Sequence, residues 1–256
     1  MHRLKTTAVS YLNTKPFLYG LFQSGLDQML DISLDIPSEC ARKLSAGEAD
    51  FGLIPVVAIS EVENPVIISD YCIGADGPVR TVMIYSDVPI DRIQKLYLDF
   101  HSRTSVRLAE ILLREYWQVS PELIPAKEGY LTDIQGDTAG IVIGDRAFAL
   151  AEKYTYQYDL GEYWKKMTGL PFVFAAWVSR SPLPQKFIDD FNAALKKGLE
   201  MIPQLIALMP SPTIDFDLER YFKNQIQYEL DAPKREALAL FLEKVNNNQE
   251  LVLSFQ

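Results

Sequence analysis

Histidine and cysteine are scarce in this chain of 256 residues. It has two histidines, His2 and His101, and two cysteines, Cys40 and Cys72. Neither cysteine stands in a Cys-x-x-Cys pair or at metal-ligand spacing, so we expect two reduced, mostly buried thiols. So few histidines argue against a His-dependent triad and against a two-His metal site. An enzyme with this sequence is expected to work without a metal or other cofactor, moving protons through polar side chains or its own substrate.

The sequence also lacks the features of several large protein classes. It has no Gly-rich phosphate loop and no dinucleotide-binding fingerprint. No stretch approaches the roughly 20 apolar residues of a membrane span, and no apolar run of signal-peptide length follows the charged start. The formal net charge of −9 argues against nucleic acid and anionic membranes as partners. We therefore expect a cytoplasmic protein that acts on a small molecule.

Strand-like and helix-like segments alternate along the chain. Strands are expected at residues 7–12, 31–36, 50–54, 66–68, 82–85, 95–99, 141–145 and 172–178. Helices are expected after Pro16, at 38–44, after Ser105, and then at 185–209, 218–230 and 233–245. Such alternation predicts an α/β protein with mainly parallel sheet.

The positions of the breaks predict two α/β lobes. We expect residues 1–88 together with 177–256 to form one lobe and residues 89–176 to form the other. The chain would leave the first lobe near Ser86 and return near Trp177, and the C-terminal helices would pack back on the first lobe. Two crossings make a hinge, and the cleft between the lobes is the expected ligand site.

One short segment between a strand and a helix is the strongest candidate for binding a small anion. It is Ser102-Arg103-Thr104-Ser105, where three hydroxyls and a guanidinium precede the helix. The first amides of a helix lack partners within the helix and carry the positive end of its dipole. One Ser or Thr is enough to cap a helix, so this composition exceeds what capping needs. We predict that the segment binds a carboxylate.

Four other polar residues flank predicted strands. Asn13 follows the first strand, at the edge where open α/β sheets bind ligands. Arg80 and Thr81 end a turn-rich stretch and are candidates to face the cleft, or else belong to a surface loop. Asp145 follows an apolar strand as a cap, an ion-pair partner or a residue that orients cleft groups. His101 is expected to be a structural loop residue rather than a base.

Six blocks together carry a resemblance to a known family. They are YLNTKP at 11–16, DFGLIP at 50–55, DGP at 76–78, SRTSVRL at 102–108, IGD at 143–145 and WKKMTGLPFVFA at 164–175. In this order they resemble the signature blocks of the chorismate dehydratase family, which catalyses the first committed step of the futalosine route to menaquinone.

The resemblance implies a fold, a reaction and roles for individual residues. The implied fold is that of type II periplasmic binding proteins, with two α/β lobes and a cleft. The implied reaction is that of a carbon–oxygen hydro-lyase, which converts chorismate to 3-[(1-carboxyvinyl)oxy]benzoate and water. Asn13 and Thr81 match positions that the family uses around its substrate, which implies catalytic roles for both. Many relatives carry Ser in place of Thr81. The resemblance also implies that the substrate's own enolpyruvyl carboxylate is the base.

Three alternatives remain at this point. One is a binding protein of the same fold that holds an aromatic carboxylate without consuming it, which the missing export signal disfavours. Another is 1,4-dihydroxy-6-naphthoate synthase, a related enzyme that relies on a histidine base in the region of Asp145, where this chain has none. The third is the sensing domain of a transcription regulator, although no DNA-binding segment is recognised before it. The sequence does not predict an oligomeric state.

Overall fold

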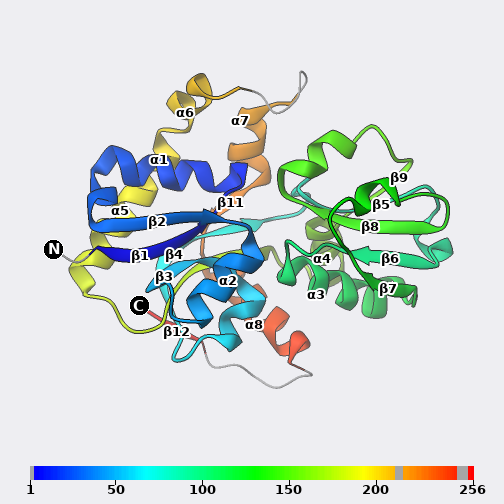
Figure 1. The fold of residues 1–256 in the computed structure, drawn as a ribbon, viewed down its shortest axis with the longest axis horizontal. Helices are drawn as coiled ribbons and strands as arrows, with labels where there is room; N and C mark the ends of the chain where they lie inside the picture. The colour runs from blue at the N-terminus through cyan, green and yellow to red at the C-terminus, as the bar shows by residue number, and fades with distance from the viewer. Residues whose placement is uncertain (1–2, 211–215, 247–252) are drawn as a thin grey trace.

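A computed structural model describes residues 3–210, 216–246 and 253–256, which fold around two β-sheets lying side by side (Figure 1). The first sheet has seven strands in the order β11-β4-β10-β3-β1-β2, with β12 paired along β4. These strands are β1 (Leu4–Val9), β2 (Leu30–Asp35), β3 (Phe51–Pro55), β4 (Val66–Ala75), β10 (Phe172–Ser179), β11 (Gln227–Glu229) and β12 (Ser254–Phe255). β1 runs parallel to β2 and β3, whereas β10 runs antiparallel to β3 and β4. Every residue of β3 and β10 is buried, as expected for apolar strands covered on both faces.

The second sheet has five strands in the order β7-β6-β8-β5-β9. They are β5 (Val82–Ser86), β6 (Lys95–Leu98), β7 (Glu122–Pro125), β8 (Thr138–Ile143) and β9 (Tyr156–Asp159). β6 is parallel to β7 and β8, while β5 is antiparallel to β8 and β9. We call the part built on the first sheet the first lobe and the part built on the second sheet the second lobe.

Helices cover both lobes. In the first lobe, α1 and α5 lie on one side of the sheet, and α2 and α8 lie on the other (Figure 1). The second lobe packs α3 and α4 against its sheet (Figure 1). The helices are α1 (Lys15–Ser24), α2 (Pro37–Ser45), α3 (Arg103–Ile111), α4 (Leu160–Thr168), α5 (Gln185–Glu200), α6 (Ile202–Leu208), α7 (Leu218–Arg220) and α8 (Ala232–Val245). Short 3-10 or π turns are η1 (Leu12–Thr14), η2 (Leu26–Met29), η3 (Val56–Glu61), η4 (Ile90–Arg92), η5 (Leu112–Trp117), η6 (Tyr130–Thr132), η7 (Gly144–Leu150) and η8 (Tyr221–Gln225).

A pair of glycines lets α1 and α5 approach closely. A Cβ atom on Gly198 would lie 1.9 Å from the carbonyl oxygen of Pro16, and one on Gly20 would lie 2.1 Å from that of Ala194. No side chain fits such a gap, so the two helices touch backbone to backbone. This contact fixes the start of α1, which directly follows η1 and its cleft residue Asn13.

Two strands belong to a different sheet from the one that the sequence predicted for them. β5 was expected in the first lobe and β10 largely in the second, but β5 belongs to the second sheet and β10 to the first. The chain therefore changes sheets between Ala75 and Val82 and again between Thr168 and Phe172. An apolar run shows that a segment is a buried strand but not which sheet it joins. The predicted domain boundaries, with one lobe at 1–88 and 177–256 and the other at 89–176, stay a prediction.

The helix predicted over 218–230 is wrong in its second half. Helical turns end at Gln225, and Gln227–Glu229 forms the strand β11 instead. β11 pairs with β4 through Gln227 and Gly74 and through Glu229 and Tyr71. The open edge of β4 supplies hydrogen bonds that a local pattern cannot reveal.

The C-terminal helices were expected to pack back on the first lobe, and the helix α8 contacts both lobes. Its Phe241 packs against Phe172 of β10, with ring centroids 4.9 Å apart, and against Trp164 of α4, at 6.0 Å. Near its end, Lys244 forms a 2.5 Å ion pair with Glu115 of η5. α8 thus bridges the lobes on the side away from α1.

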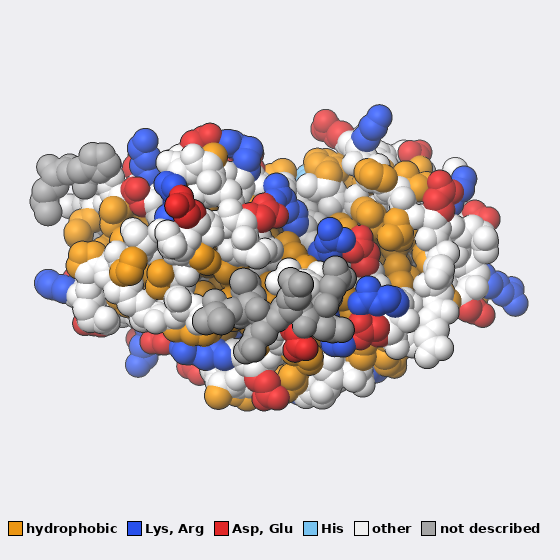
Figure 2. All heavy atoms as spheres, turned by 90° about the horizontal axis from the view of Figure 1, so that it is seen from below, with side chains coloured by type: hydrophobic (Ala, Val, Ile, Leu, Met, Phe, Trp, Pro, Cys, Tyr) orange, Lys and Arg blue, Asp and Glu red, His pale blue; other side chains and the backbone are white. Residues whose placement is uncertain are grey.

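Other expectations concern the thiols, the surface charge and the membrane. Cys40 and Cys72 are unpaired and buried, as expected, and burial raises the pKa of both thiols to about 12. On the face shown in Figure 2, Lys and Arg side chains are interspersed with Asp and Glu. Among the residues that the structure describes, no helix is long and apolar enough to cross a membrane.

Candidate functional site

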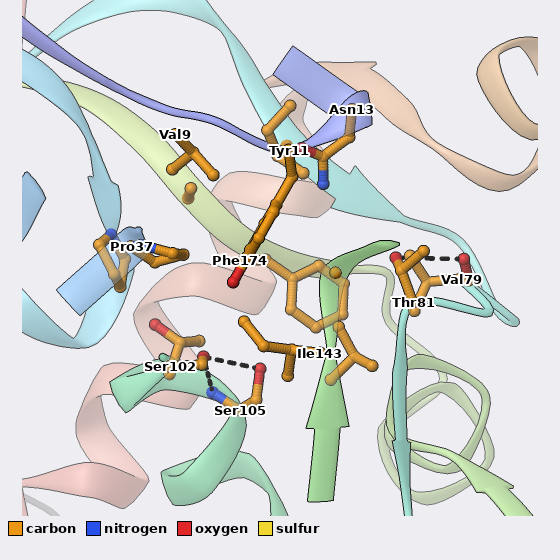
Figure 3. A pocket seen from close by; sticks show the side chains of 16 residues that line it. Val9, Tyr11, Asn13, Pro37, Val79, Thr81, Ser102, Ser105, Ile143 and Phe174 are labelled. Carbon is orange, nitrogen blue, oxygen red and sulfur yellow. Dashed lines mark hydrogen bonds between the residues drawn. The ribbon is translucent and has the colours of Figure 1, made fainter. Parts of the chain in front are cut away.

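A cavity lies where the two lobes meet, and both lobes line it (Figure 3). The first lobe contributes the end of β1, η1, the start of α2 and the end of β3, while the second contributes β5, the end of β8 and the start of α3. The lining residues are Val9, Tyr11, Asn13, Pro37, Pro55, Ile73, Val79, Thr81, Val82, Ser102, Thr104, Ser105, Ile143, Gly144, Phe174 and Ala175. Apolar walls with a few polar groups are typical of a small-molecule site.

The structure brings five of the eight predicted site residues together in this lining. They are Asn13, Thr81, Ser102, Thr104 and Ser105. They come from η1, from the loop before β5 and from the start of α3, so segments far apart in the sequence meet here. Their roles toward a ligand stay predictions.

Arg80, Arg103 and Asp145 do not line the cavity. Arg80 is exposed and has a positive φ of 62°. The guanidinium of Arg103 forms a 2.5 Å ion pair with Glu61 of η3, and both side chains are about half exposed. The carboxylate of Asp145 accepts hydrogen bonds of 3.1 and 3.3 Å from the backbone N–H of Leu12. As placed, Arg103 and Asp145 join the two lobes.

Hydrogen bonds within the 102–105 segment leave two hydroxyl hydrogens unused. Ser102 is the N-cap of α3: its Oγ accepts from the backbone N–H of Ser105 at 3.0 Å and donates to Oγ of Ser105 at 2.9 Å. Oγ1 of Thr104 accepts from the backbone N–H of Val57 at 3.3 Å. In the described part of the chain, the hydroxyl hydrogens of Thr104 and Ser105 have no acceptor, so both can donate to a ligand.

The loop that carries Thr81 is held by one buried carboxylate. Oδ2 of Asp159 accepts from the backbone N–H of Val79 at 2.8 Å and of Arg80 at 2.6 Å. Its Oδ1 caps α4 by accepting from the N–H groups of Gly161 at 3.0 Å and Glu162 at 3.2 Å. Burial raises the pKa of Asp159 to about 6, although these four bonds oppose the rise. The carboxylate thereby fixes Thr81 relative to α4.

Asn13 is held through its backbone. Its carbonyl oxygen accepts a 3.0 Å hydrogen bond from the hydroxyl of Tyr228, so the main chain of η1 is tied to β11. The side-chain amide is directed into the cavity (Figure 3). An amide there offers both a donor and an acceptor to a ligand.

Tyr11 is a polar lining residue that the sequence prediction missed. Its hydroxyl lies 2.6 Å from Nδ1 of His101, and the two rings are nearly parallel. Burial raises the pKa of Tyr11 far above its usual range, while the nearby Arg146 guanidinium opposes the rise. Tyr11 is the one ionisable side chain among the described residues that line the cavity. Its place in the YLNTKP block was a signal, but nothing in the sequence pairs it with His101.

Comparison with known proteins places this site in a family context. A family model described as menaquinone biosynthesis matches residues 4–247. The chain is 26% identical over 233 residues to a chorismate dehydratase of Thermus thermophilus, which covers 81% of this chain and 84% of that protein. It is 27% identical over 161 residues to a chorismate dehydratase of Campylobacter jejuni, with 60% and 70% covered.

Solved structures share the fold at low sequence identity. A protein from Archaeoglobus fulgidus superposes with a TM-score of 0.70 at 12% identity, covering 96% of this chain and 98% of that one. The alkanesulfonate-binding protein of Xanthomonas axonopodis gives 0.64 at 11%, covering 97% and 94%. A Candida albicans protein described as having the generic periplasmic binding protein fold gives 0.58 at 12%, covering 100% and 99%. The predicted periplasmic-binding-protein-like fold is confirmed.

Proposed function

Because the chain belongs to the menaquinone biosynthesis family, we propose that it is a chorismate dehydratase, a hydro-lyase that converts chorismate to 3-[(1-carboxyvinyl)oxy]benzoate and water. One observation carries the proposal: neutral donors lie in two places of a single, largely apolar cavity. Thr104 and Ser105 stand at the start of α3, and Asn13 and Thr81 come from η1 and the loop before β5. Chorismate has two carboxylates and a ring hydroxyl, which such donors can hold.

The donors at α3 suit a carboxylate because they combine hydroxyls with a helix start. The positive end of the helix dipole lies at this point, and it stabilises an anion by about 0.3–1 kcal/mol when exposed and more when buried. Ser102, Thr104 and Ser105 are all nearly inaccessible to solvent, at 6%, 1% and 2% exposure. A carboxylate bound here exchanges its water shell for fixed donors.

The chemistry begins at the carbon that bears the enolpyruvyl ether. Removing its hydrogen gives an anion conjugated with the ring carboxylate. Donors on that carboxylate stabilise the anion more than the ground state, which accelerates the step. Departure of the neighbouring hydroxide then makes the ring aromatic, and the proton taken from carbon joins the hydroxide as water.

The cavity lining offers no ordinary base for the first step. Among its described residues there is no carboxylate, imidazole or amine, and the phenol of Tyr11 stays protonated because burial raises its pKa. The enolpyruvyl carboxylate of the substrate is therefore the proposed base. In this scheme the 102–105 segment grips one carboxylate, while Asn13 and Thr81 orient the departing hydroxyl or the second carboxylate.

A direct test mixes the purified protein with chorismate and follows the loss of one water by mass spectrometry. Dehydration is expected for the unchanged protein, and Asn13→Ala is expected to lower kcat/KM by roughly tenfold to a hundredfold, as for loss of one hydrogen bond to a charged or polar group. Asn224→Ala, at an exposed position outside the cavity, is the matched control. Unchanged turnover by Asn13→Ala would remove Asn13 from the scheme. Binding of chorismate without its consumption would favour a binding protein of the same fold.

A further inference from the structure

Tyr11 reaches across the cleft from one lobe to the other. It follows β1 in the first lobe, whereas His101 follows β6 in the second and directly precedes Ser102. The 2.6 Å contact between the Tyr11 hydroxyl and Nδ1 of His101 therefore places the phenol beside the start of α3. Figure 3 shows the ring of Tyr11 extending from the side of Asn13 toward the side of Pro37 and Ser102.

The same stretch of the second lobe is bonded to the first lobe at neighbouring points. The carbonyl oxygen of His101 accepts from the backbone N–H of Ser38 at 3.1 Å. The backbone N–H of Val57 donates to Thr104, at 3.3 Å. Both bonds join the two lobes, so they hold the start of α3 against the lobe that carries Tyr11.

The shape of the chain around Tyr11 holds its ring in this position. Gly144, at the end of β8, has a φ of +67°, and a Cβ atom there would lie 2.8 Å from the Tyr11 ring. The ring thus packs on bare backbone of the second lobe. This packing places the ring against the second lobe, with its hydroxyl beside His101.

The protonation of His101 decides whether the phenol of Tyr11 can donate its hydrogen to a ligand. Burial lowers the pKa of His101, so its imidazole is neutral near pH 7 and carries one N–H hydrogen. When Nδ1 bears that hydrogen, it donates to the Tyr11 oxygen, and the phenol hydrogen is left for another acceptor. Thr104 and Ser105 have unused hydroxyl hydrogens in the same cavity.

We propose that Tyr11 is a further substrate-binding residue, which donates from the first lobe to the carboxylate that Thr104 and Ser105 hold from the second. His101 is a positioning residue, whose Nδ1–H orients the phenol without touching the ligand. The carboxylate site is then built from both lobes. The identity of the carboxylate as that of chorismate rests on the proposed function, but the site itself does not.

The test measures the affinity of the full chain for benzoate and for neutral benzamide by NMR titration. Tyr11→Phe is expected to weaken benzoate binding by about tenfold to a hundredfold, the loss of one hydrogen bond to a charged group, and to change benzamide binding less than about threefold. Tyr85→Phe is the matched control, because the Tyr85 hydroxyl is buried, donates to the Ala147 carbonyl at 2.8 Å and lies outside the cavity. It should bind both ligands like the unchanged protein.

The role of His101 is tested with two variants. His101→Asn keeps a side-chain N–H close to the place of Nδ1 and should retain benzoate affinity within about threefold, whereas His101→Ala removes the donor and should weaken benzoate binding by about three- to tenfold. Equal losses in both variants would overturn the positioning role.

Three outcomes would overturn the assignment of Tyr11. They are benzoate binding by Tyr11→Phe within threefold of the unchanged protein, equal losses of benzoate and benzamide, and no benzoate binding by the unchanged protein. A protein that binds benzoate through Tyr11 but leaves chorismate intact would contradict the proposed function and leave this inference standing.

Discussion

At the scale of single residues, the polar lining of the cavity consists of neutral groups. Thr81, Ser102, Thr104 and Ser105 supply hydroxyls to this lining and Asn13 supplies an amide, and the Thr81 hydroxyl already donates to the Val79 carbonyl at 3.5 Å. Neutral donors can be buried without the large cost of an unpaired charge, and they still hold an anion. This explains how a chain with a net charge of −9 can bind an anion without an arginine in the cavity lining that the structure describes.

The hydroxyl of Thr81 can be tested apart from its methyl group. Thr81→Val keeps the shape and removes the hydroxyl, so we expect kcat/KM for chorismate to fall by roughly tenfold to a hundredfold. Thr81→Ser keeps the hydroxyl and should stay within about threefold of the unchanged protein. Steady-state kinetics decide between them, and equal activity of the two variants would show that the hydroxyl has no role.

Gly144 and Gly136 form a matched pair for testing the placement of Tyr11. Both have positive φ, of 67° and 60°, but an added Cβ meets the Tyr11 ring at Gly144 and nothing within 4 Å at Gly136. Alanine at either site should cost about 1–2 kcal/mol of backbone strain. Only Gly144→Ala should also displace Tyr11 and weaken benzoate binding. Thermal unfolding and NMR titration separate the two effects, and similar binding by both variants would contradict the packing argument.

At the scale of elements, the strong periodic patterns predicted the structure well and the short segments did not. Helices behind Pro16, Ser38 and Ser105 and the apolar strand at 172–178 are found near their expected places. The short strands β7 and β9 were missed, because segments of four residues such as ELIP and YQYD are too short to show a clear alternation. They become strands by pairing along β6 and β5.

Asp159 gives a pH prediction at this scale, because it joins the Thr81 loop to α4. Its folded pKa of about 6 lies above the value of about 3.9 for an unfolded Asp. The protonated form is thus favoured by folding: this contribution is complete below about pH 4 and is lost as pH rises through about 6, a difference of about 3 kcal/mol. Asp159→Asn cannot ionise.

The free energy of unfolding, measured in urea between pH 4 and 7, checks this expectation. The stability of the unchanged protein should decline relative to that of Asp159→Asn as pH rises through this window. Parallel pH profiles for the two proteins would show that Asp159 has an ordinary pKa in the folded state.

At the scale of the whole molecule, the lobes are joined by contacts that sequence reasoning assigned to the ligand. The ion pair of Arg103 with Glu61 and the bond from Leu12 to Asp145 both cross between the lobes. Around them, α8 contacts the two lobes at once through Phe241 and Lys244. The two lobes are therefore held together by polar contacts and by a helix that bridges them.

A double-mutant cycle on Arg103 and Glu61 separates lobe closure from direct ligand contact. Exposed ion pairs contribute about 0–1 kcal/mol, so Arg103→Ala and Glu61→Ala should each weaken benzoate binding by less than about fivefold. The double variant should be no weaker than either single variant. If Arg103 instead grips the ligand, Arg103→Ala alone will lose far more affinity than Glu61→Ala in the same titration.

The sequence by itself determined the α/β class and the family resemblance, and it predicted an anion-binding role for the 102–105 segment. These follow from periodicity, from local composition and from the geometry of a helix start, all of which act over a few residues. Only the tertiary structure decided that Arg103 pairs with Glu61, that β5 joins the second sheet and β10 the first, and that Tyr11 contacts His101, 90 positions away. Those outcomes depend on which surfaces pack together, and no local pattern specifies them.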